Sequence, residues 1–251
     1  MTTVFFLFLL HLSLGLLATL PLVPERAGTR FFKLCASMAA AMTTCALLLV
    51  LRRFGLEGAS GAAGAFLVLT VLYNRAWHFG WSRATGPLLG AALAAGLGAS
   101  LAAGSGPLVI AADLTSALLL GAATSAMVLG HFYLVVLDLP ITALRRLTVL
   151  LIVALGLRAV AVAVALVGPV HAGYEEARLI ASGLWSADGI FVWMRLLFGI
   201  AGPLSLVWFI WKTVEIRSTQ SATGILYVQL FLVLAGELLA TYLRVAAGFP
   251  L

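Results

Sequence analysis

The sequence has few charged residues, because only 10% of its 251 residues are Asp, Glu, Lys or Arg. Soluble domains carry about 25% charged residues, so an ordinary soluble fold is excluded. The sequence also has no phosphate-binding glycine loop, no zinc-binding pattern and no nucleophile elbow. With so little polar sequence and no such motif, the chain is not expected to be a self-sufficient enzyme.

Cysteine is scarce as well. Cys35 and Cys45 are the two cysteines, and both lie in one apolar stretch. Ten residues of helix separate them by about 15 Å along the axis, which is too far for a disulfide. Neither cysteine belongs to a haem-attachment motif.

Long apolar runs dominate the chain, which is 63% hydrophobic and has a mean hydropathy of +1.14. A membrane crossing needs about 20 apolar residues. We therefore expect an all-α polytopic membrane protein, a single transmembrane domain over 1–251 with no soluble domain. Its eight helices are predicted at 3–23, 31–51, 61–81, 86–105, 108–136, 147–168, 190–211 and 223–246. This number of helices allows two four-helix halves.

The connections between these helices differ in charge. The odd-numbered connections hold nine Lys and Arg, whereas the even-numbered ones hold Arg52, Arg53 and Arg178. The positive-inside rule places both termini outside, in a bacterial-type inner membrane, and it explains the net charge of +6 without a nucleic-acid partner. The nine residues are Arg26, Arg30, Lys33, Arg75, Arg83, Arg145, Arg146, Lys212 and Arg217.

Five charged residues lie inside the apolar runs, all in the half of the membrane nearer the termini. An ionisable group costs several kcal/mol in the bilayer core, so it is a functional candidate by default. The structural interpretation is that they form buried ion pairs, with Arg244 reaching the outer interface. The five residues are Asp113, Arg158, Arg195, Glu237 and Arg244.

The functional interpretation is a quinone pocket open from the outer leaflet. A quinone needs an apolar slot, hydrogen-bond donors for its two oxygens and a group that carries protons. Glu237 is the predicted proton carrier, while Arg158, Arg195, Asp113 and Arg244 form or border the pocket. The expected cofactor is menaquinone or ubiquinone, as quinone or quinol.

Two histidines raise a second possibility. His78 and His131 are predicted near the inner ends of their helices, at similar depth. Two opposed imidazoles at one depth suit a membrane b-type haem. Haem b is therefore the alternative cofactor, with this pair as its ligands. Otherwise the two histidines have structural or interfacial roles or contact protons or quinone.

The segments 195–203 (RLLFGIAGP) and 235–244 (AGELLATYLR) resemble the membrane anchors of DMSO-reductase-type and polysulfide-reductase (NrfD-type) complexes. The resemblance implies an anchor without haem that exchanges electrons with quinone or quinol. It also implies an iron–sulfur subunit on the outer face, passing electrons to a molybdenum-containing catalytic subunit.

The largest predicted outer connection, about 169–189, is acidic through Glu175, Glu176 and Asp188. It is the largest surface available for docking such a partner, and the alternative interpretation is a solvated loop without a docking role. Three rival functions remain: a b-type cytochrome subunit, a small-solute or ion transporter, and a structural assembly subunit of a larger membrane complex.

Overall fold

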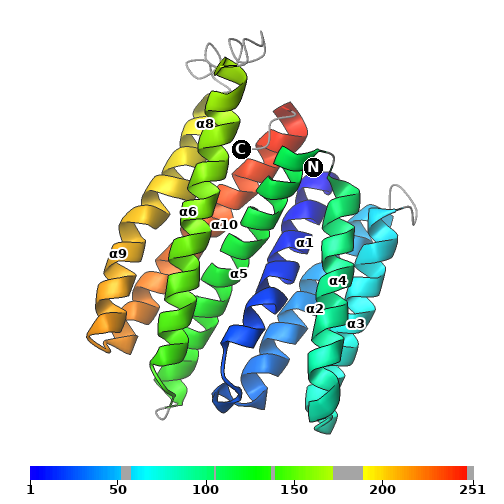
Figure 1. Cartoon of the computed structure of the whole chain (residues 1–251), viewed down its shortest axis with the longest axis vertical. Coiled ribbons are helices and arrows are strands. Elements are labelled where there is room, and N and C mark those ends of the chain that lie inside the picture. Colours follow the sequence, from blue (N-terminus) through cyan, green and yellow to red (C-terminus); the bar gives the residue numbers. More distant parts are fainter. Residues whose placement is uncertain (52–57, 105, 137–138, 172–188, 248–251) are drawn as a thin grey trace.

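A computed structural model of the chain describes residues 1–51, 58–104, 106–136, 139–171 and 189–247 (Figure 1). These residues form helices and short connections and contain no strand. The elements are α1 (Thr2–Thr19), η1 (Leu20–Leu22), η2 (Glu25–Ala27), α2 (Thr29–Leu51), α3 (Ala59–Phe79), α4 (Ser82–Ala103), α5 (Pro107–Val135), α6 (Thr142–His171), α8 (Gly189–Leu196), η3 (Leu197–Ala201), α9 (Gly202–Glu215) and α10 (Thr219–Ala247).

The predicted all-α polytopic fold is confirmed. Seven spans in the described residues are long and apolar enough to cross a membrane, and each matches a predicted helix. One of them, Gly189–Glu215, combines α8, η3 and α9. The remaining predicted helix, 61–81, corresponds to α3. It is not among the seven, although it lies alongside α2 and α4 in the bundle.

The start of α1 and the end of α10 lie at the same end of the bundle (Figure 1). We call this the terminal end. The opposite or basic end carries the nine Lys and Arg of the odd-numbered connections. Arg52, Arg53, Arg178 and the acidic docking residues Glu175, Glu176 and Asp188 lie outside the described residues.

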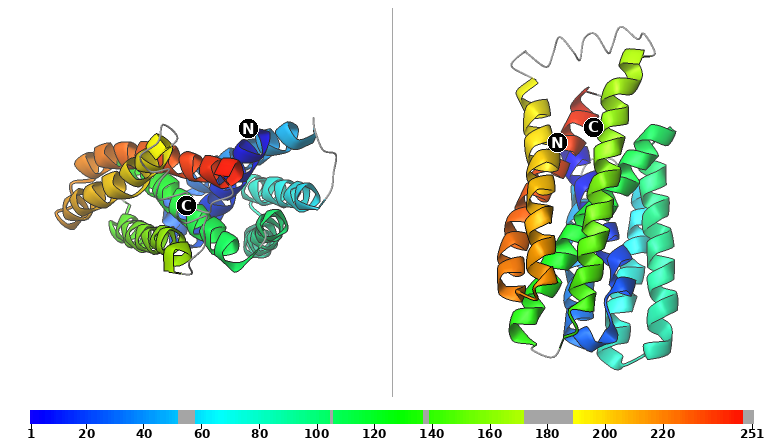
Figure 2. Two further views of the ribbon diagram at one scale, coloured as in Figure 1. Left: turned by 90° about the horizontal axis from the view of Figure 1, so that it is seen from above. Right: turned by 60° about the vertical axis from the view of Figure 1, so that its left-hand side comes forward.

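The helices α1 and α5 form the centre of the bundle (Figure 2). In the most apolar stretches of these two helices, 72% and 67% of the residues are buried. The corresponding share in the other spans is 22–39%. Where they cross, the backbone of Gly15 touches that of Ala117 and Gly121. Small residues of this kind allow membrane helices to pack closely without a hydrophobic driving force. Because α1 and α5 join the first four helices to the rest, the two groups form one bundle.

The span from α8 to α9 is interrupted by the π-helical turn η3. Pro203 follows this turn and has no N–H to donate to the carbonyl of Gly199, so regular α-helical bonding cannot continue there. The distorted turn brings Gly199 against Gly236 of α10. Two residues without side chains thus bring these helices into close contact.

The crossing of α1 and α5 predicts the effect of Gly15→Val. Its added carbons would meet the backbone of α5, and we expect a loss of about 3 kcal/mol or more in the free energy of unfolding. Gly64→Val is the matched control, because Gly64 is also helical but has open space around it. Thermal unfolding in detergent measures both, and equal stability of the two variants would contradict the role given to the crossing.

Candidate functional site

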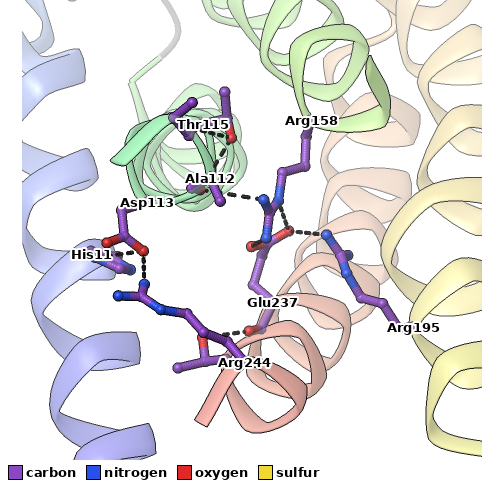
Figure 3. Close-up of polar contacts among 10 residues, drawn as sticks. His11, Ala112, Asp113, Thr115, Arg158, Arg195, Glu237 and Arg244 are labelled. Atoms are coloured by element: carbon purple, nitrogen blue, oxygen red, sulfur yellow. Dashed lines mark hydrogen bonds and ion pairs between the residues drawn. The ribbon is translucent and has the colours of Figure 1, made fainter. Parts of the chain in front are cut away.

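The five charged residues predicted inside the membrane come together in one layer (Figure 3). The layer lies in the half of the bundle nearer the terminal end. Three of them form the Glu237 cluster. Arg158 donates from Nε and Nη2 to the two carboxylate oxygens of Glu237, each at 3.0 Å, and Arg195 Nη2 donates to Oε1 at 2.9 Å. The side chains of Glu237 and Arg195 are 0% exposed and that of Arg158 is 3% exposed. One buried carboxylate therefore forms ion pairs with two buried guanidinium groups.

The other two residues form the Asp113 cluster together with a histidine. Arg244 Nη1 pairs with Asp113 Oδ1, and His11 Nε2 lies 3.7 Å from the same oxygen. The interpretation of Arg244 as a residue that only reaches the outer interface is wrong. Its side chain is 14% exposed and is paired with the carboxylate of Asp113 inside the bundle.

His11 is the member of the site that sequence reasoning did not assign. It is buried in the middle of α1, and its Nε2 also lies 3.3 Å from the hydroxyl of Ser100 on α4. The signal in the sequence is that His11 lies within an apolar run, as the five charged residues do. A single histidine in a helix does not indicate which residue it contacts. The packing of α1 against α5 brings His11 beside Asp113.

Helix geometry explains how distant segments supply these groups. Glu237 and Arg244 are seven residues apart and share one face of α10. Arg195 comes from α8 and passes the Gly199–Gly236 contact to reach the carboxylate. Arg158 of α6 also donates to the carbonyl of Ala112, at 3.3 Å, beside Asp113 on α5. Arg158 therefore links the two clusters.

The layer holds more positive than negative charge. Three arginines face two carboxylates, so the net charge is +1 when His11 is neutral. Arg195 Nε and Nη1 and Asp113 Oδ2 are buried and have no hydrogen-bond partner among the described residues. Each such group costs about 1–3 kcal/mol when left unpaired. The layer thus has spare donors and an excess cation for an oxygen-bearing or anionic ligand.

A small cavity lies between the clusters. It is bordered by Asp113, Ser116, Arg158 and Arg244, and it has room for about one water molecule. A water there would connect the two clusters. The cavity is too small for a quinone ring, so the charged layer by itself is not a finished quinone pocket.

The two predicted haem ligands are not brought together. His131 lies on α5 with Nδ1 3.3 Å from the hydroxyl of Tyr227 on α10. His78 is exposed at the last turn of α3, which packs mainly against α2 and α4. Within the described part of the chain, no group of three or more His, Cys, Asp or Glu is arranged to hold a metal ion.

Comparisons with known proteins supply no relative for this site. No protein-family model, curated protein or solved structure matches the chain. The function must therefore be inferred from the chemistry of the charged layer and of its surroundings.

The burial of the Asp113–Arg244 pair predicts strong coupling between its members. In a double-mutant cycle of Asp113→Asn and Arg244→Gln, we expect a coupling energy of about 2 kcal/mol in unfolding experiments. The exposed pair Lys212–Glu215 is the control, expected at about 0.5 kcal/mol or less because water and salt screen it. Similar coupling in both cycles would contradict the structural role of the buried pair.

Proposed function

We propose that the chain is an integral membrane subunit of a respiratory oxidoreductase that exchanges electrons and protons with the quinone pool. The observation that supports this most is Arg195, a fully buried arginine with two unpaired nitrogen donors beside a carboxylate. A quinone ring presents carbonyl oxygens that accept such hydrogen bonds. As electrons arrive, negative charge develops on these oxygens, and a buried guanidinium stabilises it.

The ring has a suitable apolar neighbourhood one helical turn from Arg195. A second hydrophobic cluster, separate from the main core, joins α6, α8 and α10 there. Phe191 lies four residues before Arg195, on the same face of the helix, and its ring is 5.5 Å from that of Tyr242. Both rings are only partly buried. In the proposal, the quinone ring enters from the lipid by displacing side chains of this cluster and meets the free donors of Arg195.

Reduction of a quinone to a quinol takes two electrons and two protons. The electrons come from an iron–sulfur partner, and in quinol oxidation the flow reverses. Glu237 carries a proton once Arg195 turns toward the ring, because the hydrogen bond from Arg195 to Oε1 is then lost and one acceptor position on that oxygen becomes free. Arg158 stays bound to Glu237 through two hydrogen bonds and keeps the carboxylate in position, while Asp113, Arg244 and His11 border the water cavity beside it.

The Lys and Arg residues of the basic end support the proposal that this chemistry takes place in the outer half of the membrane. With the basic end in the cytoplasm, the charged layer lies in the outer half of a bacterial-type inner membrane. The iron–sulfur partner then docks on the terminal end and passes electrons to or from a catalytic subunit. The resemblance of 195–203 and 235–244 to NrfD-type anchors agrees with this assignment.

A carrier of small anions is the second candidate. The excess positive charge of the layer and its water-sized cavity favour it. A carrier would bind small anions such as formate at Arg195 and would show no preference for quinones.

Arg195→Lys tests the quinone site, because it keeps the charge and removes the planar pair of donors. Hydrogen bonds to charged groups contribute about 1.5–3 kcal/mol, so we expect binding of a short-chain quinone to weaken about 10-fold or more. Quenching of tryptophan fluorescence by the quinone, with the protein in lipid nanodiscs, measures the affinity.

Arg217→Lys is the control for this substitution, since Arg217 is exposed at the basic end. Unchanged affinity in Arg195→Lys would overturn the site, and displacement of the quinone by formate would favour the carrier.

Glu237→Gln, in membranes that contain the assembled complex, is expected to slow quinol turnover by about 100-fold or more through loss of the proton carrier.

The proposed orientation is tested with single cysteines in a variant lacking Cys35 and Cys45. Thr3→Cys lies exposed at the terminal end, and Ser82→Cys lies exposed at the basic end. A membrane-impermeant maleimide added to intact cells is expected to label Thr3→Cys at once and Ser82→Cys only after permeabilisation. The reverse pattern would place the charged layer in the inner half of the membrane.

A further inference from the structure

A second feature with binding chemistry lies at the basic end, on the lipid-facing side of α6. It is an open groove of about 520 Å³ between η1 and the first half of α6. The volume falls in the range of about 300–1,000 Å³ that is typical of ligand pockets. The residues that line it are Leu22, Thr142, Arg145, Arg146, Val149, Leu150 and Val153.

The lining is polar at one end and apolar along the rest. Thr142, Arg145 and Arg146 belong to the first turns of α6, at the level where the bundle ends. Val149, Leu150 and Val153 follow on the same face at spacings of three and four residues. The stripe from 142 to 153 spans about 16 Å of helix. Its order, polar at the membrane surface and apolar deeper in, matches an amphiphile that lies along the helix.

The guanidinium groups of the two arginines have no ion-pair or hydrogen-bond partner among the described residues. Both are exposed. The Arg145 guanidinium lies over the ring of Trp211, 5.3 Å from its centroid, an arrangement that orients the group without neutralising it. Two adjacent and uncompensated guanidiniums are suited to a phosphate, because each presents several N–H groups in a planar fork.

We propose that this groove binds a phospholipid with an anionic headgroup. Its phosphate lies between Arg145 and Arg146, and one acyl chain follows Val149, Leu150 and Val153 toward the centre of the membrane. Charge complementarity selects the anionic lipid over a zwitterionic one, whose own cation is repelled by the same two arginines. The site is separate from the charged layer near the terminal end and does not depend on the quinone proposal.

Native mass spectrometry tests the binding with purified, delipidated protein and mixed vesicles of phosphatidylcholine and phosphatidylglycerol. We expect wild-type protein to retain phosphatidylglycerol preferentially. Arginines near a membrane surface contribute about 1 kcal/mol each toward anionic lipid, so Arg145→Gln/Arg146→Gln is expected to reduce this affinity about 30-fold. Arg26→Gln/Arg30→Gln is the matched control, because it removes two exposed charges at the same end that do not line the groove.

A steric variant separates the groove from general surface charge. Val153→Trp fills the apolar part of the groove and leaves both arginines in place. Val160→Trp is its control, since Val160 is exposed on the same helix but does not line the groove. We expect phosphatidylglycerol retention to fall in the first variant and to stay unchanged in the second.

Three outcomes would overturn the proposal. Equal loss in the two arginine double variants would show that only the overall charge of the basic end matters. Retention of phosphatidylcholine as strong as that of phosphatidylglycerol would remove the basis for selection by charge. Full competition by glycerol phosphate, without an acyl chain, would show a headgroup site that does not use the groove.

Discussion

The arrangement of this bundle depends on the carboxylate of Glu237, which holds two arginines from other helices in a medium of low dielectric constant. A buried guanidinium without a countercharge costs several kcal/mol, so Arg158 and Arg195 bring α6 and α8 to this point on α10. The Asp113 cluster extends the same principle to α5 and α1. Five helices thus meet in one layer, where each of these charged side chains lies beside a countercharge.

Close packing of glycines makes this layer possible. Gly199 and Gly236 let α8 approach α10 closely enough for Arg195 to reach Glu237, and Gly15 with Gly121 lets His11 approach Asp113. Membrane helices gain little from hydrophobic association with one another, so contacts between small residues and buried polar pairs share the task of holding them together. The layer holds the helices together through ion pairs. It also contains the unpaired donors of Arg195, on which the proposed chemistry depends.

The sequence predicts the crossing helices well, because each needs about 20 apolar residues and the charges that end them are easy to see. The five buried charges are also identified individually, since an ionisable residue in an apolar run is conspicuous. Their pairing does not follow from the sequence, because residues as distant as Asp113 and Arg244 meet only through the packing of α5 against α10. The pairing of His11 with Asp113 is not predicted for the same reason. A proline inside an apolar helix indicates a local distortion, but only the structure shows that the turn before Pro203 is π-helical.

The amino-acid sequence by itself determined that the chain is a helical membrane protein, where its helices run and which polar residues they carry, because hydrophobicity and helix length are local properties. Only the tertiary structure decided that Glu237 serves two arginines, that Arg195 retains unpaired donors and that Arg145 and Arg146 open onto an apolar groove. These facts depend on the rotation and closeness of helices distant in sequence. Glycine contacts and buried ion pairs set that geometry, and neither has a signature that specifies its partner.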